Sequence, residues 1–165
     1  MRPTCLTLES ESVTPAKPQV RAARADDAPT IADFNLALAI ETEHLQLDRA
    51  TVVAGVRAGL ADPTKAAYFI AEIGGNTAGC CMITHEWSDW RNGDMWWLQS
   101  VYVHPDFRRR GVFAAMYRHV EETARAAGVA CIRLYVERDN AAAKATYQSL
   151  GMSLTQYQVM EQRLR

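Results

Sequence analysis

Three consecutive arginines, Arg108–Arg110, stand directly before Gly111, where an alternating apolar run gives way to a helical pattern. The first N–H groups of a helix lack partners within the helix, and the aligned peptide dipoles make that end partly positive. A phosphate can accept hydrogen bonds from these N–H groups, and its negative charge is favourable at the positive helix end. A glycine lets the backbone approach the phosphate, and arginines add charge-assisted hydrogen bonds to it. The stretch is interpreted as a diphosphate site, the alternative being a solvated basic turn. It matches neither GxxxxGKS/T nor GxGxxG, so nucleotide hydrolysis has no support.

A second group of polar residues lies further along the chain. Asn140 and Tyr147 are seven residues apart, close to two helical turns, so a helix places both side chains on one face. Lys144 lies between them, four residues after Asn140. A capping asparagine and a packed aromatic ring are the alternative interpretation of this spacing.

Two carboxylates are also candidates for chemistry. Glu41 falls inside an apolar stripe of the helical pattern over 31–47, and a carboxylate there is costly unless it has a partner or a function. The stripe consists of Ile31, Phe34, Leu38 and Leu45. Glu86 ends a predicted strand just before a tryptophan-rich loop. An ion pair with an arginine such as Arg49 or Arg91 is the alternative for either carboxylate.

The elements that must position these residues follow from turn signals and hydrophobic periodicity. Strands are expected at 20–24, 67–73, 77–87, 95–103, 130–136 and 154–160, and helices at 31–47, 50–60, from Gly111 to about 127, and at 140–150. Gly74–Asn76 predicts a hairpin turn. The order indicates the α/β (α+β) class, with a mixed, mostly antiparallel central sheet flanked by helices. Residues 1–19 are expected to form a flexible tail and 20–165 a single domain.

The composition argues against several classes of function. The chain has 165 residues, a formal net charge of -1, 48% hydrophobic and 22% charged residues, which is ordinary for a soluble globular protein. Without a basic excess, Arg108–Arg110 are not expected to bind nucleic acid. No apolar stretch has the length of a membrane span or the form of a signal peptide, so a cytoplasmic location without membrane association is expected.

The cysteines give no sign of a metal site or a disulfide. No CxxC pair exists among them; they are Cys5, Cys80, Cys81 and Cys131. Neighbours in a strand point to opposite faces, so at least one of Cys80 and Cys81 is expected in the core. A zinc site from these two and His85 lacks a second ligand pair with metal spacing, and no metal is expected. An enzyme with Cys131 or Cys81 as nucleophile is the weakest alternative, because no histidine is an evident partner.

Both polar groups resemble motifs of one family. Val101-Tyr102-Val103-His104-Pro105, followed by Arg108-x-x-Gly111, resembles the acyl-CoA signature of the GNAT superfamily of N-acetyltransferases. That signature is Gln/Arg-x-x-Gly-x-Gly/Ala at a helix start, after a strand ending in apolar-x-Val-x-Pro. Phe113 departs from it where Gly or Ala is usual, and its N–H can still face a phosphate if the ring turns into the core. The phrase N-x(6)-Y-x-x-L-G-M over 140–152 resembles the family's second cofactor segment, and the element order over 20–160 is also similar.

The resemblance implies acetyl-CoA as the co-substrate. It implies that the pyrophosphate lies on the backbone N–H groups of Arg109 to Ala114, and that the pantetheine arm lies beside Val101–Val103 like an added strand. The residues expected to bind acetyl-CoA are Val101, Tyr102, Val103, Arg108, Arg109, Arg110, Gly111, Val112, Phe113, Ala114, Asn140 and Lys144.

The resemblance also implies catalytic roles. Tyr147 becomes the candidate general acid, since a phenol with a pKa of about 10 can protonate the leaving thiolate. Glu41 and Glu86 are the candidate bases that remove a proton from the amine. A free backbone N–H near the end of the preceding strand would bind the developing oxyanion. Gln99 of that strand, expected on the same face as Val101, cannot act as a base.

The acceptor is expected to be a primary amine of a small cationic molecule. The acidic stretches 41–48 and 86–97, the second rich in tryptophan, suit a cation through ionic and cation–π contacts. For Trp96 and Trp97 themselves, packing is the preferred interpretation. A CoA-binding sensor or interaction module without turnover is the alternative function. The oligomeric state is left open, and an exposed strand at 154–160 is compatible with a symmetric homodimer.

Overall fold

The computed structural model of the protein describes residues 16–164. Most of the tail predicted for 1–19 lies outside the described residues. The elements are β1 (Gln19–Ala22), α1 (Ala28–Glu43), α2 (Arg49–Ala61), β2 (Ala67–Ile73), β3 (Asn76–Ser88), β4 (Gly93–Val103), α3 (Val112–Ala126), β5 (Cys131–Leu134) and α4 (Ala141–Ser149). Short 3-10 helices at Ala25–Asp27 and Pro105–Phe107 precede α1 and α3.

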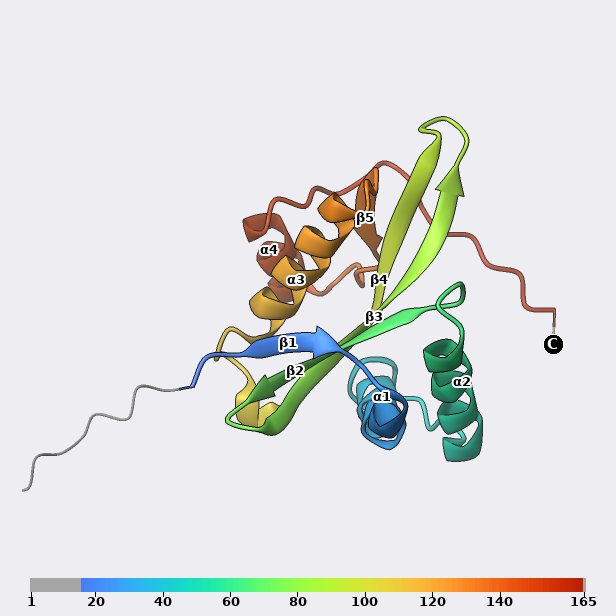
Figure 1. The fold of residues 1–165 in the computed structure, drawn as a ribbon. Helices are drawn as coiled ribbons and strands as arrows, with labels where there is room; N and C mark the ends of the chain where they lie inside the picture. Colours follow the sequence, from blue (N-terminus) through green and yellow to red (C-terminus); the bar gives the residue numbers. More distant parts are fainter. Residues whose placement is uncertain (1–15, 165) are drawn as a thin grey trace, which may run out of the picture.

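The strands form one sheet in the order β1-β2-β3-β4-β5. The pairs β1–β2, β2–β3 and β3–β4 are antiparallel, and β5 pairs with β4 in parallel. The predicted class, a mixed and mostly antiparallel sheet flanked by helices, is confirmed (Figure 1). The hairpin at Gly74–Asn76 is also confirmed, because Gly74 and Gly75 both adopt the left-handed backbone that a two-residue turn requires.

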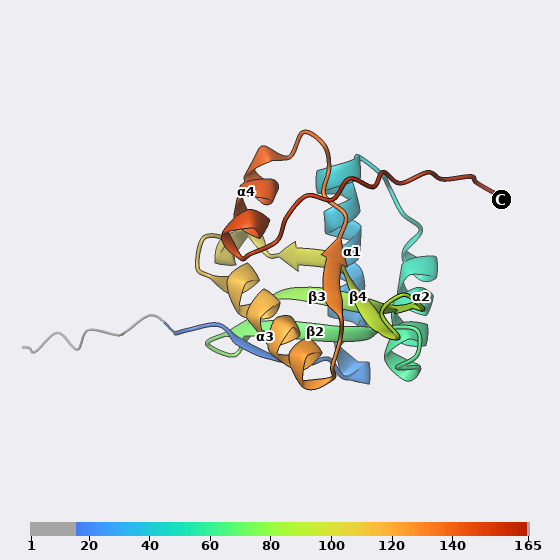
Figure 2. The same cartoon turned by 90° about the horizontal axis from the view of Figure 1, so that it is seen from above.

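Helices cover both faces of the sheet, and each face has its own core cluster (Figures 1 and 2). Under α3 lie Phe69, Cys81, Ile83, Trp96, Leu98, Met116 and Val120, among others. Under α1 and α2 lie Ile31, Phe34, Val56, Ile70, Cys80 and Tyr102, among others. Cys80 and Cys81 thus point to opposite faces, as predicted. Within the described residues, no helix combines the length and apolar character needed to cross a membrane.

The end of α1 differs from the prediction of a helix to residue 47. α1 ends at Glu43 because His44 adopts a left-handed backbone with a φ of 54°, and the Leu45 N–H then bonds the Ala39 carbonyl over 3.1 Å. This is a common helix-ending geometry, but glycine or asparagine usually provides it. Leu45 consequently leaves the apolar stripe and is 53% exposed.

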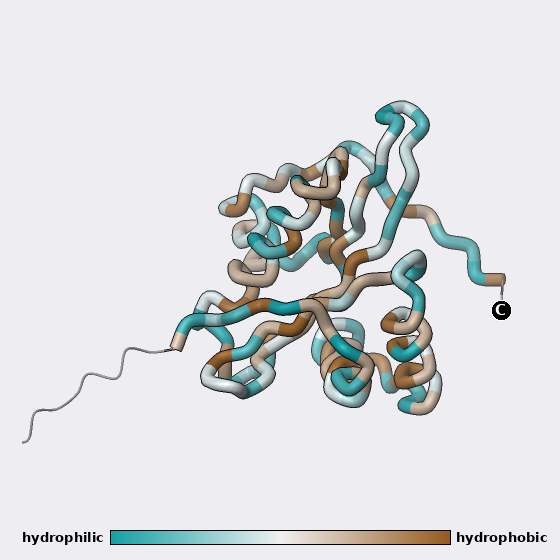
Figure 3. The backbone as a smooth tube through the Cα atoms, viewed as in Figure 1, coloured by the Kyte–Doolittle hydropathy of each residue, from teal (hydrophilic) through white to brown (hydrophobic). Residues whose placement is uncertain are grey.

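The strand predicted at 154–160 does not form. These residues have no regular secondary structure and extend away from the sheet (Figure 1). The sequence alternation is typical of a strand, but a strand needs a hydrogen-bonding partner, and the described chain brings none beside it. Figure 3 shows apolar and hydrophilic residues mixed along this segment, and a hydrophilic tip on the β3–β4 hairpin.

Candidate active site

β4 contains an extra residue relative to β3 near its middle. Cys80 lies opposite Tyr102 and Met82 lies opposite Gln99, so two steps along β3 match three along β4. Ser100, within the inserted stretch, has a φ of 48°. This is a β-bulge, which bends a strand and changes the direction of the side chains that follow.

The bulge overturns one sequence prediction. Leu98 and Val101 both pack in the cluster under α3 although they are three residues apart. Gln99 instead donates a hydrogen bond to Thr84 Oγ1 over 2.6 Å. Gln99 and Val101 therefore lie on opposite faces of the sheet, and the expectation of a common face is wrong, because regular alternation does not pass through a bulge.

β4 and β5 pair over only part of their length. The pairing covers Met95–Leu98 and Cys131–Leu134 and ends there. Residues 99–103 therefore have β3 on one side and no strand of the described chain on the other. Free backbone groups on that edge can hydrogen-bond an extended, amide-containing molecule as an added strand would. Val101–Val103, the predicted pantetheine residues, lie on this edge.

The chain then turns sharply into α3. Arg109 and Gly111 both have left-handed backbones, with φ of 59° and 77°. Gly111 is the N-cap of α3 and offers no side chain to the first N–H groups of that 15-residue helix. Those N–H groups are left without helical partners at the positive end of the helix dipole.

The space at this turn suits a diphosphate. A Cβ atom built at Gly111 would meet no other atom within 4 Å, so the turn opens onto free space. The Phe113 ring packs against the core under α3, which leaves the backbone side of the turn clear. Arg109 and Arg110 are exposed beside it. Unpartnered donors, cationic side chains and open space together fit the binding of a phosphate linkage.

Arg108 links this turn to α1 and to the end of β4. Its Nη2 donates to Glu41 Oε2 over 2.6 Å, and its Nε donates to the Val103 carbonyl over 3.0 Å. The Tyr102 hydroxyl donates to the other oxygen of Glu41 over 2.8 Å. The guanidinium also lies 5.7 Å from the centre of the Tyr102 ring. The structure thus joins a predicted base to two predicted cofactor residues, a connection that the sequence did not suggest.

These contacts set the charge of Glu41. Partial burial acts to raise its pKa, but hydrogen bonds from Arg108 and Tyr102 outweigh burial, so the pKa lies below its ordinary value. Burial, followed by the bond to Glu41, raises the pKa of Tyr102. At neutral pH Glu41 is therefore an ionised carboxylate, held between the Arg108 guanidinium and the neutral Tyr102 phenol.

Glu86 belongs to a different group of contacts. Its carboxylate accepts from Trp97 Nε1 and forms an ion pair with Arg133, with 3.3 Å between Oε1 and Nη1. The Trp97 ring stacks on Tyr135 with centroids 4.5 Å apart, so Trp97 packs as preferred from the sequence. Glu86 lies opposite Met95, seven residues before Tyr102 on β4, or roughly 20 Å along the strand. The two predicted bases are not brought together.

The polar residues of α4 have local partners. Asn140 is the N-cap of α4, and its Oδ1 accepts from the Ala143 N–H over 2.9 Å. Lys144 Nζ donates to the Arg138 carbonyl. The capping interpretation of Asn140 therefore describes this structure, while its predicted contact with pantetheine stays a prediction.

Tyr147 lies on α4 against the start of α3. Its ring meets the Phe113 ring edge-on, with centroids 5.5 Å apart. Burial raises the pKa of the Tyr147 phenol, so the group is a proton donor at neutral pH. The two predicted motifs thus touch through a residue that departs from the family signature.

A cavity of about 510 Å³ lies between α1, α2 and the bulge of β4. It is lined by Asn35, Leu38, Ala39, Thr42, Glu43, Leu47, Val52, Gly55, Val56, Tyr68 and Ser100. The predicted stretch 41–48 thus contributes Thr42, Glu43 and Leu47 to the cavity, and its carboxylate there is Glu43 rather than Glu41. Sequence reasoning missed Ser100, because no local signal marks a bulge that depends on pairing with β3.

Asn35 is the other residue that sequence reasoning missed. Its Oδ1 is buried and has no hydrogen-bond partner among the described residues. A buried polar atom without a partner is costly. An amide inside the apolar run of α1 was the available signal for this residue, which also contributes to the cavity lining.

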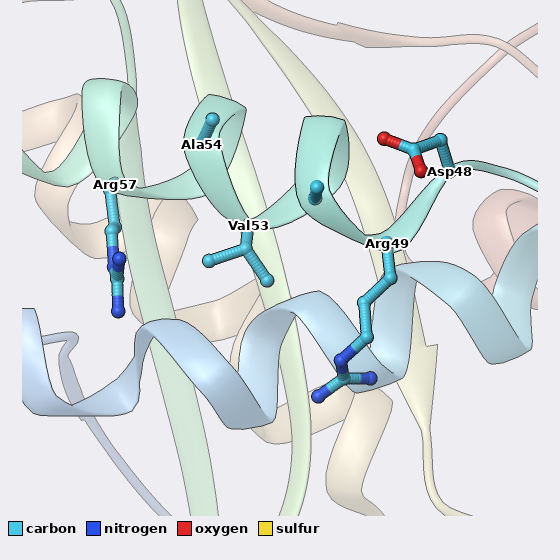
Figure 4. Close-up of a pocket in the computed structure, with 6 residues that line it drawn as sticks. Asp48, Arg49, Val53, Ala54 and Arg57 are labelled. Atoms are coloured by element: carbon cyan, nitrogen blue, oxygen red, sulfur yellow. The ribbon is translucent and has the colours of Figure 1, made fainter.

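The other hollow and the other polar side-chain groups of the described chain offer fewer reactive groups. A hollow of about 570 Å³ is lined only by Asp48 and α2 residues, including Arg49 and Arg57 (Figure 4), and Arg49 forms an ion pair with Asp33. Within residues 16–164, no cluster of three or more His, Cys, Asp or Glu side chains could hold a metal ion. Burial raises the pKa of the Cys80 thiol to about 12, which keeps that sulfur protonated.

Comparison with known proteins agrees with this geometry. The model described as the acetyltransferase (GNAT) family matches residues 33–152. A crystal structure of a possible acetyltransferase from Clostridium difficile 630 is 40% identical, with a TM-score of 0.84 over 90% of this chain and 99% of that one. A protein described as a predicted acetyltransferase from Clostridium acetobutylicum, crystallised with acetyl-CoA, has a TM-score of 0.73 at 16% identity, over 88% of this chain and 96% of that one, which shows a shared fold.

A curated relative matches over a shorter stretch. The ribosomal protein bS18-alanine N-acetyltransferase of Escherichia coli K12 is 39% identical over 56 residues. That stretch covers 34% of this chain and 38% of the relative. The family match nevertheless extends over most of this protein. The chain belongs to the acetyltransferase (GNAT) family, a family of acetyl-CoA-dependent N-acetyltransferases.

Proposed function

We propose that this protein transfers the acetyl group of acetyl-CoA to a primary amine by direct attack, with Tyr147 as the general acid. One observation carries the proposal: the edge of β4 at 99–103, which no described strand pairs, leads through a short 3-10 helix to the N-terminus of α3, where no side chain caps the first N–H groups. An edge that accepts amides followed by a helix end that accepts phosphates matches the chemical order of pantetheine and diphosphate.

The cofactor-binding residues act in two ways in this proposal. The backbone of Val101–Val103 bonds the pantetheine arm, and the N–H groups of Val112, Phe113 and Ala114 bond phosphate oxygens. Arg109 and Arg110 add charge. Arg108 holds the turn against Glu41 and Val103. Asn140 and Lys144 complete the set from α4.

Catalysis then requires a proton donor, an oxyanion site and a proton acceptor. The raised pKa of Tyr147 keeps its phenol protonated, so that it can donate to the leaving thiolate. Backbone N–H groups next to the Ser100 bulge are the candidates for the oxyanion site. The cavity between α1 and α2 reaches the same bulge through Ser100, which would bring an acceptor to the thioester.

Three carboxylates are candidates for the proton acceptor. Glu41 and Glu86 are each held in an ion pair, whereas Glu43 lines the cavity. Glu41→Gln, Glu43→Gln and Glu86→Gln compare the three. The base is the residue whose amide variant lowers kcat by about 10²-fold or more and removes the acidic limb of the pH–rate profile.

We propose a small cationic amine as the acceptor. The cavity has the volume of a small-molecule site, and its lining is mainly apolar with one carboxylate. An amine with a short apolar body fits that lining. The second candidate is the N-terminal amine of a protein, supported by the bS18-alanine N-acetyltransferase relative.

The test is release of CoA from acetyl-CoA in the presence of polyamines, amino acids, aminoglycosides and a peptide with an N-terminal alanine. Tyr147→Phe should lower kcat by about 10²- to 10⁴-fold and leave the Kd for CoA within about twofold. Tyr157→Phe, at an exposed position, is the matched control. CoA binding without turnover on any amine would instead identify a sensor. No binding of CoA would refute the assignment of the turn.

A further inference from the structure

One face of the sheet, where β3, β4 and β5 lie side by side, is not covered by any helix of residues 16–164. Leu98, Ile132 and Leu134 pack in the cluster under α3, so the side chains that alternate with them point to the opposite face. On that opposite face α1 packs on β3 and β4 and α2 packs on β2, whereas the helix that packs on β5 is α3 (Figure 1). We call the side chains left there the helix-free face; they are Glu86, Trp97, Arg133 and Tyr135.

Trp97 lies at the centre of the helix-free face. Its Nε1 donates to Glu86 Oε2, and its ring stacks on Tyr135 with centroids 4.5 Å apart. Arg133 Cζ lies 5.7 Å from the centre of the same ring, and the Arg133 guanidinium also donates to Glu86. The side chains therefore hold one another in place, and a group that is already ordered binds a ligand at a smaller entropic cost.

Arg133 is only partly engaged by these contacts. Its Nη1 lies 3.3 Å from Glu86 Oε1 and 3.4 Å from Oε2, which is long for a charge-assisted hydrogen bond. Its Nε and Nη2 have no hydrogen-bond partner in the part of the chain that the structure describes, and the side chain is 28% exposed. A guanidinium presents its N–H donors as a planar fork that suits a carboxylate. Arg133 therefore has donors left for an anion from outside the chain.

Glu86 has little capacity left for a cation. Its Oε1 accepts from Arg133, and its Oε2 accepts from Arg133 and Trp97. The guanidinium also compensates its charge. The unused hydrogen-bonding capacity of the helix-free face thus belongs to Arg133, and the face suits an anionic group rather than the ammonium of an acceptor.

The helix-free face adjoins the place where acetyl transfer is proposed. Trp97 is three residues before Ser100, which corresponds to roughly 10 Å along an extended strand. Gln99 lies between them and bonds Thr84, the residue opposite Trp97 on β3. Arg133 is the partner of Trp97 on β5. An acceptor whose amine reaches the bulge can therefore extend past Gln99 to Arg133.

We propose that the acceptor is an amine with a carboxylate roughly 10 Å from its nitrogen, and that Arg133 binds this carboxylate and determines specificity. This inference rests on the proposed acetyl transfer at the Ser100 bulge. The amine nitrogen bonds the acyl carbon, the carbon–sulfur bond breaks, and the proton lost by the amine is balanced by the proton gained by the CoA sulfur. The carboxylate takes no part in these steps. The exposed ring of Tyr135 lies beside the bound chain.

Matched pairs of amines test the proposal. Release of CoA is measured with aminobutyrate, aminohexanoate and aminooctanoate, each with a terminal amine, and with the neutral carboxamide of each. For wild type, kcat/KM should rise with chain length, and aminooctanoate should exceed its carboxamide by about tenfold or more.

Variants of Arg133 show where this preference arises. Arg133→Gln should remove the preference by raising the KM for the carboxylates, with kcat within about threefold and the carboxamides unchanged. Arg133→Lys should keep part of the preference, because it keeps the charge but not the fork. Arg118→Gln, at an exposed position on α3, is the matched control and should keep all of it.

A binding measurement separates this inference from the proposed function. Isotope-labelled protein with CoA is titrated with aminooctanoate and with its carboxamide, and the magnetic resonance signals of Arg133 Nε–H and Trp97 Nε1–H are followed. Both signals should shift with aminooctanoate only. An equal response to the two compounds, or a preference that survives Arg133→Gln, would overturn the role of Arg133. Absence of CoA binding or of acetyl transfer, with both signals still shifting, would refute the proposed function and leave the carboxylate site standing.

Discussion

The ring of Phe113 in the first turn of α3 meets the ring of Tyr147 on α4 edge-on, with centroids 5.5 Å apart and planes at 68°. Phe113 stands where the family signature usually has Gly or Ala, so this ring contact is one that the usual residue could not make. Phe113 also packs against the core under α3. The cofactor turn and the proposed general acid are therefore mechanically connected through one aromatic side chain.

We expect Phe113 to act as a positioning residue for Tyr147. An edge-to-face pair contributes about 0.5–1.5 kcal/mol to stability beyond area burial. Its loss should also misplace the Tyr147 hydroxyl and lower kcat, by up to about tenfold. Phe113→Ala should lower both kcat and thermal stability. Phe113→Leu should restore most of the stability but not kcat, while the Kd for CoA changes little in either. Equal recovery of kcat and stability in Phe113→Leu would show that the ring only fills space.

The sequence predicted the fold through its local signals. The hairpin turn at Gly74–Asn76, the helix start after Gly111 and the capping Asn140 each depend on neighbouring residues, and each lies where expected. The bounds of most elements shift by only a few residues, because ends of helices and strands depend on details such as the left-handed backbone of His44.

The site was predictable only where its residues lie in one motif. Arg108 and Gly111 were found because they are close in sequence. The contact of Glu41 with Arg108 spans 67 positions and depends on how α1 crosses the sheet. The Ser100 bulge depends on registry with β3, and the missing strand at 154–160 depends on a partner. The Glu41–Arg108 contact, the bulge and the missing strand all depend on how distant segments pair. The periodicity of a single segment gives no information about such pairing.

Glu41 should matter more for binding acetyl-CoA than for chemistry. Both of its oxygens are occupied, and its lowered pKa makes it a weak base. Glu41→Gln should raise the KM for acetyl-CoA several-fold through a displaced Arg108, with kcat within about threefold. Because the side chains of Glu41 and Arg108 are 40% and 45% exposed, the unfolding free energy of Glu41→Gln should differ from that of wild type by less than about 1 kcal/mol. A collapse of kcat at unchanged KM would assign the base role to Glu41 instead.

Gly79 should be required for the packing of β3 against the end of β4. A Cβ atom there would lie 2.5 Å from the Tyr102 carbonyl oxygen and 3.3 Å from Val112 Cγ1. Gly79→Ala must push apart the strand end and helix that form the cofactor turn, at about 1–3 kcal/mol of unfolding free energy. Gly55→Ala is the control, because a Cβ in that helix meets nothing and should stabilise by about 0.5–1 kcal/mol. Urea unfolding measures both, and equal stability of Gly79→Ala and wild type would contradict the steric argument.

The ion pair at the start of the domain should make stability fall in acid. Arg21 Nη1 lies 2.7 Å from Asp27 Oδ2, and the Arg24 N–H donates to the same oxygen over 2.6 Å. The Arg21 hydrogen bond, opposed by burial and aided by the Arg24 N–H, lowers the pKa of Asp27 below its ordinary value of 3.8. Because the folded pKa is lower than the unfolded one, the stabilisation is complete above pH 3.8 and is lost as the pH falls through the folded pKa.

Asp27→Asn should therefore be less stable than wild type at pH 7, and the difference in unfolding free energy should shrink below pH 3.8. Asp33→Asn, which removes an exposed ion pair with Arg49, is the control and should change the unfolding free energy at pH 7 by less than about 1 kcal/mol. A gap between Asp27→Asn and wild type that does not change with pH would mean that Asp27 stabilises the fold by packing rather than by its charge.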